Sequence, residues 1–309
     1  MITGTSMTEN FKASELDEMF SGKSIKVPYS GGTFKEIDES VQLAINCNKD
    51  LKMVVRGLDC MRFTNDSELM RTDMGDYPTY LYDNNIFNDI EYFASGFNET
   101  IKIIFRSLRG AKQFSFDEYS RWHDLFKYGK DSVQTSPITN VPKSTRKMSQ
   151  EERERMKKNI DKNVVKTIKD NPNVNFCYFF TPYSALYWRI MLLEDTLDVQ
   201  IESERYIIEQ LINLPNVSLV SLNDCFDITT NLNFYRDWIH YGDWINSFVL
   251  RCFKENRHVL NKSNYEIYLT NLRDFYWNYD FSEMNNYEDI KDDEGAKTIL
   301  EELIKQGKI

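Results

Sequence analysis

The sequence is poor in the residues that build disulfide scaffolds, metal sites and membrane spans. Its 309 residues include five cysteines and three histidines, and no two cysteines form a CxxC pair. An odd, scattered set of cysteines argues against a disulfide framework and against a zinc site, so we expect free thiols, mostly buried, and no metal. No segment approaches the roughly 18 consecutive apolar residues of a membrane-spanning helix, and no basic and apolar signal peptide opens the chain.

Basic residues are also in the minority. The chain has 38 Lys and Arg against 48 Asp and Glu, a formal net charge of −10. Proteins that bind DNA or RNA depend on Lys and Arg contacts to phosphate, so we expect no nucleic-acid partner. Aromatic residues make up 14% of the chain. They are expected to fill the core or to line a cleft that stacks on sugars, and the sequence leaves both interpretations open.

Short apolar segments alternate with helical patterns along the chain. Strands are predicted at residues 1–3, 24–27, 51–55, 175–180 and 218–222, and helices include residues 36–46 and 185–214. Nearly continuous apolar runs indicate strands that are buried on both faces, as in parallel sheets, and the alternation predicts right-handed crossovers. We therefore expect one domain over residues 1–309 with an α/β fold, a flavodoxin-like three-layer α/β/α arrangement around a five-stranded parallel sheet.

The segment between the third and fourth predicted strands is much longer than a crossover requires. A crossover needs a dozen or so residues, so we predict a mainly helical insertion at about 64–172. Within it, Ser149 and Glu152 form a capping-box pattern, and apolar residues follow at i+4 spacing from Met156 to Ile168. The basic stretch from 143 to 169 is either a solvated helix face or a patch for an anionic polymer or membrane surface. A C-terminal extension is expected at about 261–309, with a helix at 294–305.

A candidate nucleophile follows the first predicted strand. Gly4-Thr5-Ser6 lies between that strand and a helical pattern. Ester hydrolysis by serine requires an exposed hydroxyl at such a tight turn, where a backbone N–H also faces the developing oxyanion. A serine at this place is also a common helix N-cap, so the signal by itself is weak. Because only three residues precede Gly4, we expect the native protein to continue upstream with a fuller first strand.

A candidate base and its orienting acid lie near the other end of the chain, in Asp237-Trp238-Ile239-His240. A nucleophilic serine needs a histidine base, and the histidine needs a carboxylate partner. The i and i+3 spacing places both side chains on one side of a turn. The other two histidines, His123 and His258, lie in less suggestive settings.

Together, the Gly-Thr-Ser and Asp-x-x-His motifs resemble the first and last blocks of the SGNH (GDSL-like) hydrolases. The resemblance implies a serine esterase with a catalytic triad of Ser6, Asp237 and His240, which needs no cofactor. Tyr29-Ser30-Gly31-Gly32 resembles the second block, in which a glycine N–H joins the Ser6 N–H in the oxyanion hole. Gly31 is the better match and Gly32 remains possible; an ordinary glycine loop that precedes a helix at Thr33 is the alternative.

The third block departs from the family pattern. The chain has Arg56-Gly57-Leu58-Asp59 where the family has Gly-x-Asn-Asp, so Leu58 replaces an asparagine that donates to the oxyanion. The loss of one such donor costs about 10²–10³ in rate. We therefore expect a slow enzyme, a replacement donor, or drift away from hydrolysis. Asp59 is expected to line the site, together with Gly32, Tyr183 and Tyr241.

A narrower likeness extends over most of the chain. Five motifs are together similar to SGNH proteins of Gram-positive cell envelopes: Gly4-Thr-Ser-Met-Thr-Glu-Asn, Gly57-Leu-Asp, Tyr80-Leu-Tyr-Asp-Asn, Phe180-Thr-Pro-Tyr-Ser and Asn233-Phe-Tyr-Arg-Asp. This likeness implies an extracytoplasmic, cell-surface location, with membrane attachment only through an N-terminal anchor upstream of this sequence.

The function implied is an esterase that removes a short acyl group, such as acetyl, from a cell-envelope glycan. Its partner is then an acylated carbohydrate or a small ester. Two alternatives stay open. One is an O-acyltransferase with the same triad, in which a sugar hydroxyl replaces water. The other is a catalytically weak glycan-binding or scaffold protein, an interpretation that Leu58 favours and that the three triad residues oppose.

Overall fold

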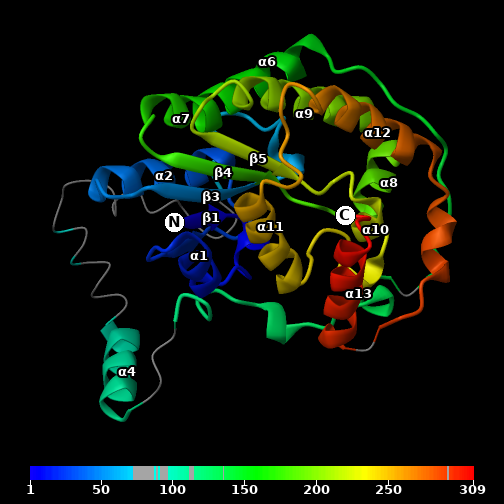
Figure 1. Cartoon of the computed structure of the whole chain (residues 1–309). Helices are drawn as coiled ribbons and strands as arrows, with labels where there is room; N and C mark the ends of the chain where they lie inside the picture. The colour runs from blue at the N-terminus through cyan, green and yellow to red at the C-terminus, as the bar shows by residue number, and fades with distance from the viewer. Residues whose placement is uncertain (72–86, 88–89, 91–96, 111–114, 135, 291) are drawn as a thin grey trace.

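The computed structural model describes residues 1–71, 87, 90, 97–110, 115–134, 136–290 and 292–309. Five parallel strands form one sheet in the order β2-β1-β3-β4-β5, which is the flavodoxin-like order (Figure 1). They are β1 (Ile2–Gly4), β2 (Lys26–Pro28), β3 (Met53–Leu58), β4 (Asn175–Phe180) and β5 (Val217–Ser221). The predicted α/β fold with a five-stranded parallel sheet is confirmed.

Helices cover both faces of the sheet (Figure 1). On one face, α1 (Ala13–Phe20) packs against α11 (Asp243–Glu255). On the other face lie α2 (Phe34–Cys47) and α9 (Leu197–Leu211). Because both faces are covered, the central strands are apolar on both sides; Val54, Val55 and Phe176 have no exposed surface.

A long helical stretch connects β3 to β4 against α2. It consists of α6 (Gln150–Ile160), a π-helical turn (Asp161–Val165) and α7 (Lys166–Asp170). The capping box at its start is present, because Ser149 accepts from the Glu152 N–H and Glu152 accepts from the Ser149 N–H. The predicted apolar stripe is buried, with at most 1% of each side chain exposed: Met156, Ile160, Val164 and Ile168. This stripe fixes which face of the helix meets the sheet.

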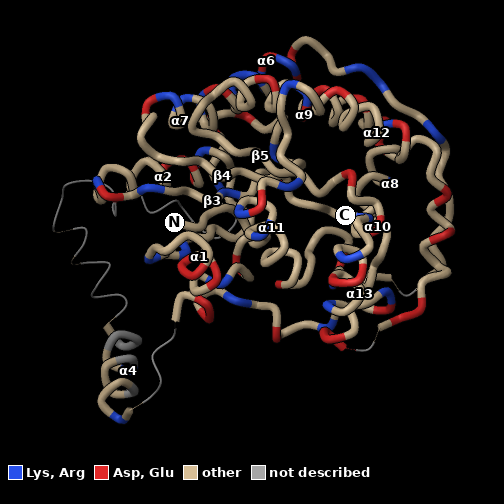
Figure 2. Tube along the Cα trace, viewed as in Figure 1, with Lys and Arg blue, Asp and Glu red and all other residues tan. Residues whose placement is uncertain are grey.

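The basic stretch at 143–169 faces solvent and is mixed with acidic partners. Ion pairs join Arg153 to Glu202, Lys162 to Glu68, and Lys166 to Asp170. Figure 2 shows basic and acidic residues interspersed along α6 and α7. These ion pairs favour the first of the two interpretations, a solvated helix face. Earlier in the 64–172 segment, the structure has α4 (Phe97–Leu108) and α5 (Lys130–Val133), while the Tyr80 motif lies outside the described residues.

The predicted helix at 185–214 is two helices, α8 (Ala185–Leu193) and α9. The chain turns between them at Asp195, whose φ is +57°. Aspartate tolerates this left-handed conformation better than most residues, and the apolar pattern continues across the break, which is why the sequence did not reveal it.

The C-terminal extension packs onto the domain. Its helix α12 (Tyr265–Asn278) contacts α8 and α9, and α13 (Asp293–Lys305) matches the predicted helix with one more residue at its start. Short helices complete the described elements: α10 (Phe226–Thr229) and the 3₁₀ turns Ser6–Thr8, Cys60–Arg62, His123–Leu125, Leu232–Phe234 and Phe281–Asn286. All five cysteines are free, and only Cys47 is exposed.

Candidate active site

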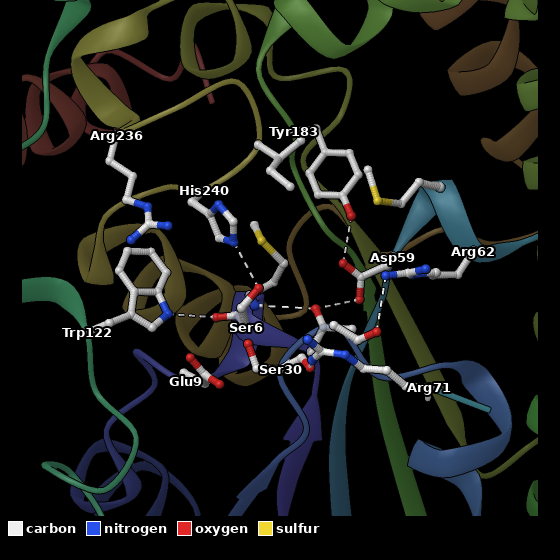
Figure 3. Close-up of a pocket in the computed structure, with 15 residues that line it drawn as sticks. Ser6, Glu9, Ser30, Asp59, Arg62, Arg71, Trp122, Tyr183, Arg236 and His240 are labelled. Carbon is white, nitrogen blue, oxygen red and sulfur yellow. Dashed lines mark hydrogen bonds between the residues drawn. The ribbon is translucent and has the colours of Figure 1, made fainter. Parts of the chain in front are cut away.

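The loops that follow the first three strands meet at the carboxyl edge of the sheet. β1 leads to Ser6, β2 leads to Ser30 and Gly31, and β3 leads to Asp59. In open parallel sheets ligands bind at this edge, next to the point where the strand order reverses. All four residues line one cavity of about 390 Å³. Figure 3 shows this cavity with Ser6 at its centre.

The structure brings Ser6, His240 and Asp237 together from opposite ends of the chain. Ser6 Oγ lies 2.8 Å from His240 Nε2, and His240 Nδ1 lies 2.7 Å from Asp237 Oδ2. This is the arrangement in which a carboxylate orients an imidazole, and the imidazole in turn takes a proton from a serine hydroxyl.

A small hairpin sets the positions of the histidine and its carboxylate. Tyr235 and Tyr241 pair in antiparallel fashion, and the Arg236 N–H donates to the His240 carbonyl. At the tip, Asp237 Oδ1 accepts hydrogen bonds from the N–H groups of Ile239 and His240, at 2.9 and 2.8 Å. The Asp-x-x-His spacing therefore lets one carboxylate cap its own turn and hold the imidazole at the same time.

Asp237 is ionised at neutral pH. Burial alone acts to raise the pKa of its carboxyl, but the hydrogen bonds and charge of His240, with the two backbone N–H groups, lower the pKa to about 2. Arg236 adds a further hydrogen bond, from Nε to Asp237 Oδ2 at 3.1 Å. The carboxylate is thus available to stabilise positive charge on His240.

Two residues that line the cavity have backbone N–H groups with no acceptor in the part of the chain that the structure describes. Within the residues that the structure describes, neither the Ser6 N–H nor the Gly31 N–H donates a hydrogen bond. Gly31 has φ +67°, and a Cβ built there would lie 2.8 Å from the Arg71 guanidinium, so only glycine fits. Arg71 donates to the Ser30 carbonyl, and Arg62 Nη2 donates to the Gly31 carbonyl at 3.1 Å. Two arginines therefore hold the carbonyls of this loop.

Leu58 is fully buried in the core and does not line the cavity. Among the described residues that line it, none is an asparagine or glutamine. The site accordingly has no side-chain amide donor in this part of the chain, as the departure from Gly-x-Asn-Asp led us to expect. Arg62 and Arg71, which donate to the carbonyls of the Gly31 loop, were not predicted from the sequence.

Asp59 is buried behind the nucleophile turn, and its side-chain hydrogen bonds to the described residues all come from hydroxyl groups. Thr5 Oγ1 donates to Asp59 Oδ2 at 2.9 Å, and Tyr183 Oη donates to Asp59 Oδ1 at 2.6 Å. Burial raises the pKa of this carboxyl. Asp59 and Tyr183 line the cavity as predicted, whereas Gly32 and Tyr241 do not; the Gly32 N–H donates to the Tyr29 carbonyl, and Tyr241 is buried beneath the site with its hydroxyl on the Met7 carbonyl.

Trp122, from the segment between β3 and β4, closes one wall of the cavity and was missed by sequence reasoning. Its Nε1 donates to the Ser6 carbonyl at 3.1 Å, and its ring meets the His240 ring edge-on at 5.3 Å. Figure 3 shows it beneath the Arg236 guanidinium. The only signal in the sequence was its place beside His123, which we had considered only as a candidate base.

A second cavity of about 300 Å³ adjoins the first, and Met61 lines both. Trp238, two residues before His240, lines this second cavity with 37% of its surface exposed. Its ring is nearly parallel to that of Tyr187, with an interplanar angle of 12°. The histidine hairpin therefore contributes to both cavities.

Other kinds of site were searched for within the same residues. No group of three or more His, Cys, Asp or Glu side chains that could hold a metal ion occurs among the described residues. None of the described helices has the length and apolar character needed to span a bilayer. Comparisons with protein-family models, with curated proteins and with solved structures give no match.

Proposed function

We propose that this protein is a serine esterase of the SGNH type that removes a short acyl group from a cell-envelope glycan. The observation that carries the proposal is the chain of contacts from Ser6 Oγ through His240 to Asp237, at 2.8 and 2.7 Å. Ser6 and His240 are 234 positions apart, so the contact between them does not arise from local sequence.

The reaction follows from this geometry. Ser6 Oγ attacks the ester carbonyl while His240 Nε2 takes its proton, and the N–H groups of Ser6 and Gly31 stabilise the oxyanion. His240 then gives the proton to the leaving alkoxide, which departs as an alcohol and leaves an acyl-serine. Water repeats the sequence and releases the carboxylic acid, which restores Ser6. Because no side-chain amide lines the cavity among the described residues, we expect slow turnover.

The second cavity supports a sugar as the alcohol part of the substrate. A sugar ring presents C–H groups that pack on an aromatic face, while its hydroxyls need polar partners. Trp238 offers such a face beside the catalytic histidine, and Gln200, Glu194 and Thr64 also line this cavity. The choice of a cell-envelope glycan, and of a location outside the membrane, depends on the motif resemblance.

The test is turnover of p-nitrophenyl acetate by the wild type beside Ser6→Ala and His240→Ala. Each variant should lose at least about 10³-fold in kcat/KM, because the triad acts as a unit. Ser263→Ala, at an exposed serine outside the cavity, serves as the matched control and should keep the wild-type rate. Equal traces for wild type and both triad variants would sink the esterase proposal. Turnover that appears only with an added sugar acceptor would identify an acyltransferase.

A further inference from the structure

Arg236 is placed where the leaving group of an ester must lie. His240 Nε2 delivers a proton to the leaving oxygen, so the alcohol part of the substrate passes next to this imidazole. Arg236 lies on the same hairpin, lines the same cavity and has its guanidinium close to His240 in Figure 3. A charged group on the leaving alcohol, bound next to His240, would therefore lie near Arg236.

Three contacts hold the guanidinium of Arg236, and part of it remains exposed. Its Nε donates to Asp237 Oδ2, while its central carbon lies 4.5 Å from the centre of the Trp122 ring and 3.7 Å from that of Phe126. Its two terminal nitrogens donate to no acceptor among the described residues. With 20% of the side chain exposed, these N–H groups are available at the cavity in a partly dry setting. An edge of this kind suits a carboxylate or phosphate.

The remaining charges of the cavity favour an anion there. Arg62 lines it and donates to the Gly31 carbonyl, a neutral acceptor, and its charge also acts on the buried Asp59 carboxyl. The acidic residues that line it are Glu9 and Asp59; burial raises the pKa of both carboxyls, while the charges of His240 and Arg236 act on Glu9 in the opposite direction. The ionised Asp237 is already shared between His240 and Arg236 Nε. A chain with a net charge of −10 thus presents arginines around its serine.

We propose that the leaving alcohol of the substrate carries an oxyanion group, a carboxylate or a phosphate, which the terminal N–H groups of Arg236 bind. This inference rests on the esterase function proposed above and narrows its substrate to acyl esters of an anionic glycan. The bound anion holds the ester oxygen beside His240 Nε2, so Arg236 contributes to specificity for the alcohol.

The test uses pairs of esters that differ by one negative charge. The carboxylate pair is 4-acetoxybenzoate and 4-acetoxybenzamide; the phosphate pair is 1-acetylglycerol 3-phosphate and 1-acetylglycerol. The wild type should favour the charged member of at least one pair by about tenfold or more in kcat/KM, as expected for one charge-assisted contact. Whichever pair shows the larger preference identifies the anion.

Arg236→Gln should bring that preference close to parity, and Arg236→Lys should keep part of it, because lysine retains the charge without the planar fork. Arg205→Gln removes the same charge from an exposed ion pair with Glu266, outside the cavity, and should keep the wild-type preference. If Arg236→Gln slows both members of a pair by the same factor, Arg236 only positions Asp237 and the inference is overturned.

A second measurement needs no variant. The product 4-hydroxybenzoate should inhibit p-nitrophenyl acetate turnover about tenfold more strongly than 4-hydroxybenzamide. Ser6-dependent turnover without any preference for charge, in both substrates and inhibitors, would overturn the anion subsite and leave the esterase intact. Turnover that does not depend on Ser6 would overturn both.

Discussion

Two aspartates lie near the nucleophile, and they differ in their hydrogen-bond partners and in the direction of their pKa shifts. Asp237 accepts from an imidazole, a guanidinium and two backbone N–H groups, and its pKa falls to about 2. Among the described residues, the partners of Asp59 are the hydroxyls of Thr5 and Tyr183, and burial raises its pKa. In Figure 3, Asp59 and His240 approach Ser6 from different directions. The partners of a carboxyl, and not its nearness to a serine, decide whether it can stabilise a charged histidine.

The largest expected effect comes from exchanging each aspartate for its amide. Asp237→Asn should lower kcat on p-nitrophenyl acetate by about 10³–10⁴-fold, because a neutral amide no longer stabilises the imidazolium or fixes its tautomer. Asp59→Asn should cost less than about tenfold, because the hydroxyls of Thr5 and Tyr183 can rotate to accept from the new amide. Losses of equal size would show that the two carboxyls do not have separate roles.

The next largest effect concerns Gly31, whose N–H is the proposed donor to the oxyanion. Gly31→Ala should lower kcat by about 10²-fold or more, because the Cβ meets Arg71 and displaces a donor to the oxyanion. Gly110→Ala is the matched control. Gly110 also has a positive φ, +74°, but nothing lies within 4 Å of its added Cβ. The control should lose stability of about 1–2 kcal/mol, measured by urea unfolding, and keep its activity. Equal activity of the two variants would remove Gly31 from the site.

A third carboxyl extends the comparison from activity to stability. Glu204 is buried, accepts from Tyr268, Gln200 and Cys60, and has no cationic partner among the described residues; burial raises its pKa to about 7. A raised pKa in the folded state means that stability is greatest below the unfolded value, near 4.5, and falls as pH rises through about 7. Between these limits the wild type should lose roughly 2–3 kcal/mol of unfolding free energy, and Glu204→Gln should flatten this slope. Parallel slopes in both proteins would contradict the assignment.

The smallest effect concerns the indole that supports the Ser6 turn. Trp122→Phe removes the hydrogen bond from Nε1 to the Ser6 carbonyl, worth about 1 kcal/mol, so kcat should fall by less than about tenfold. Trp277→Phe, on α12 and outside both cavities, makes the same chemical change and should leave kcat at the wild-type value. If both variants match the wild type, Trp122 does not position the serine.

The sequence predicted the parts of this molecule that depend on local patterns. Buried parallel strands have nearly continuous apolar sequences, and β4 lies at the predicted residues 175–180. The Ser149 capping box and the stripe from Met156 to Ile168 are likewise local, and both are present. The pairing of Asp237 with His240 is local too, since three residues separate them.

The features that were not predicted from the sequence depend on contacts between distant segments. Trp122 lies 116 residues from Ser6 in the sequence, and no periodicity records the contact between them. The turn at Asp195 interrupts a continuous apolar pattern, so its position depends on the packing of α8 and α9. Tyr241 was predicted to line the site, but the hairpin turns its ring beneath the cavity.

The separation of Ser6 from His240 has a consequence for the order of synthesis. The ribosome adds the histidine 234 residues after the serine. While those residues are being added, the nascent chain carries a serine that has no base to activate it. A product released early, at any codon before that of His240, would keep the serine and lack the means to deprotonate it.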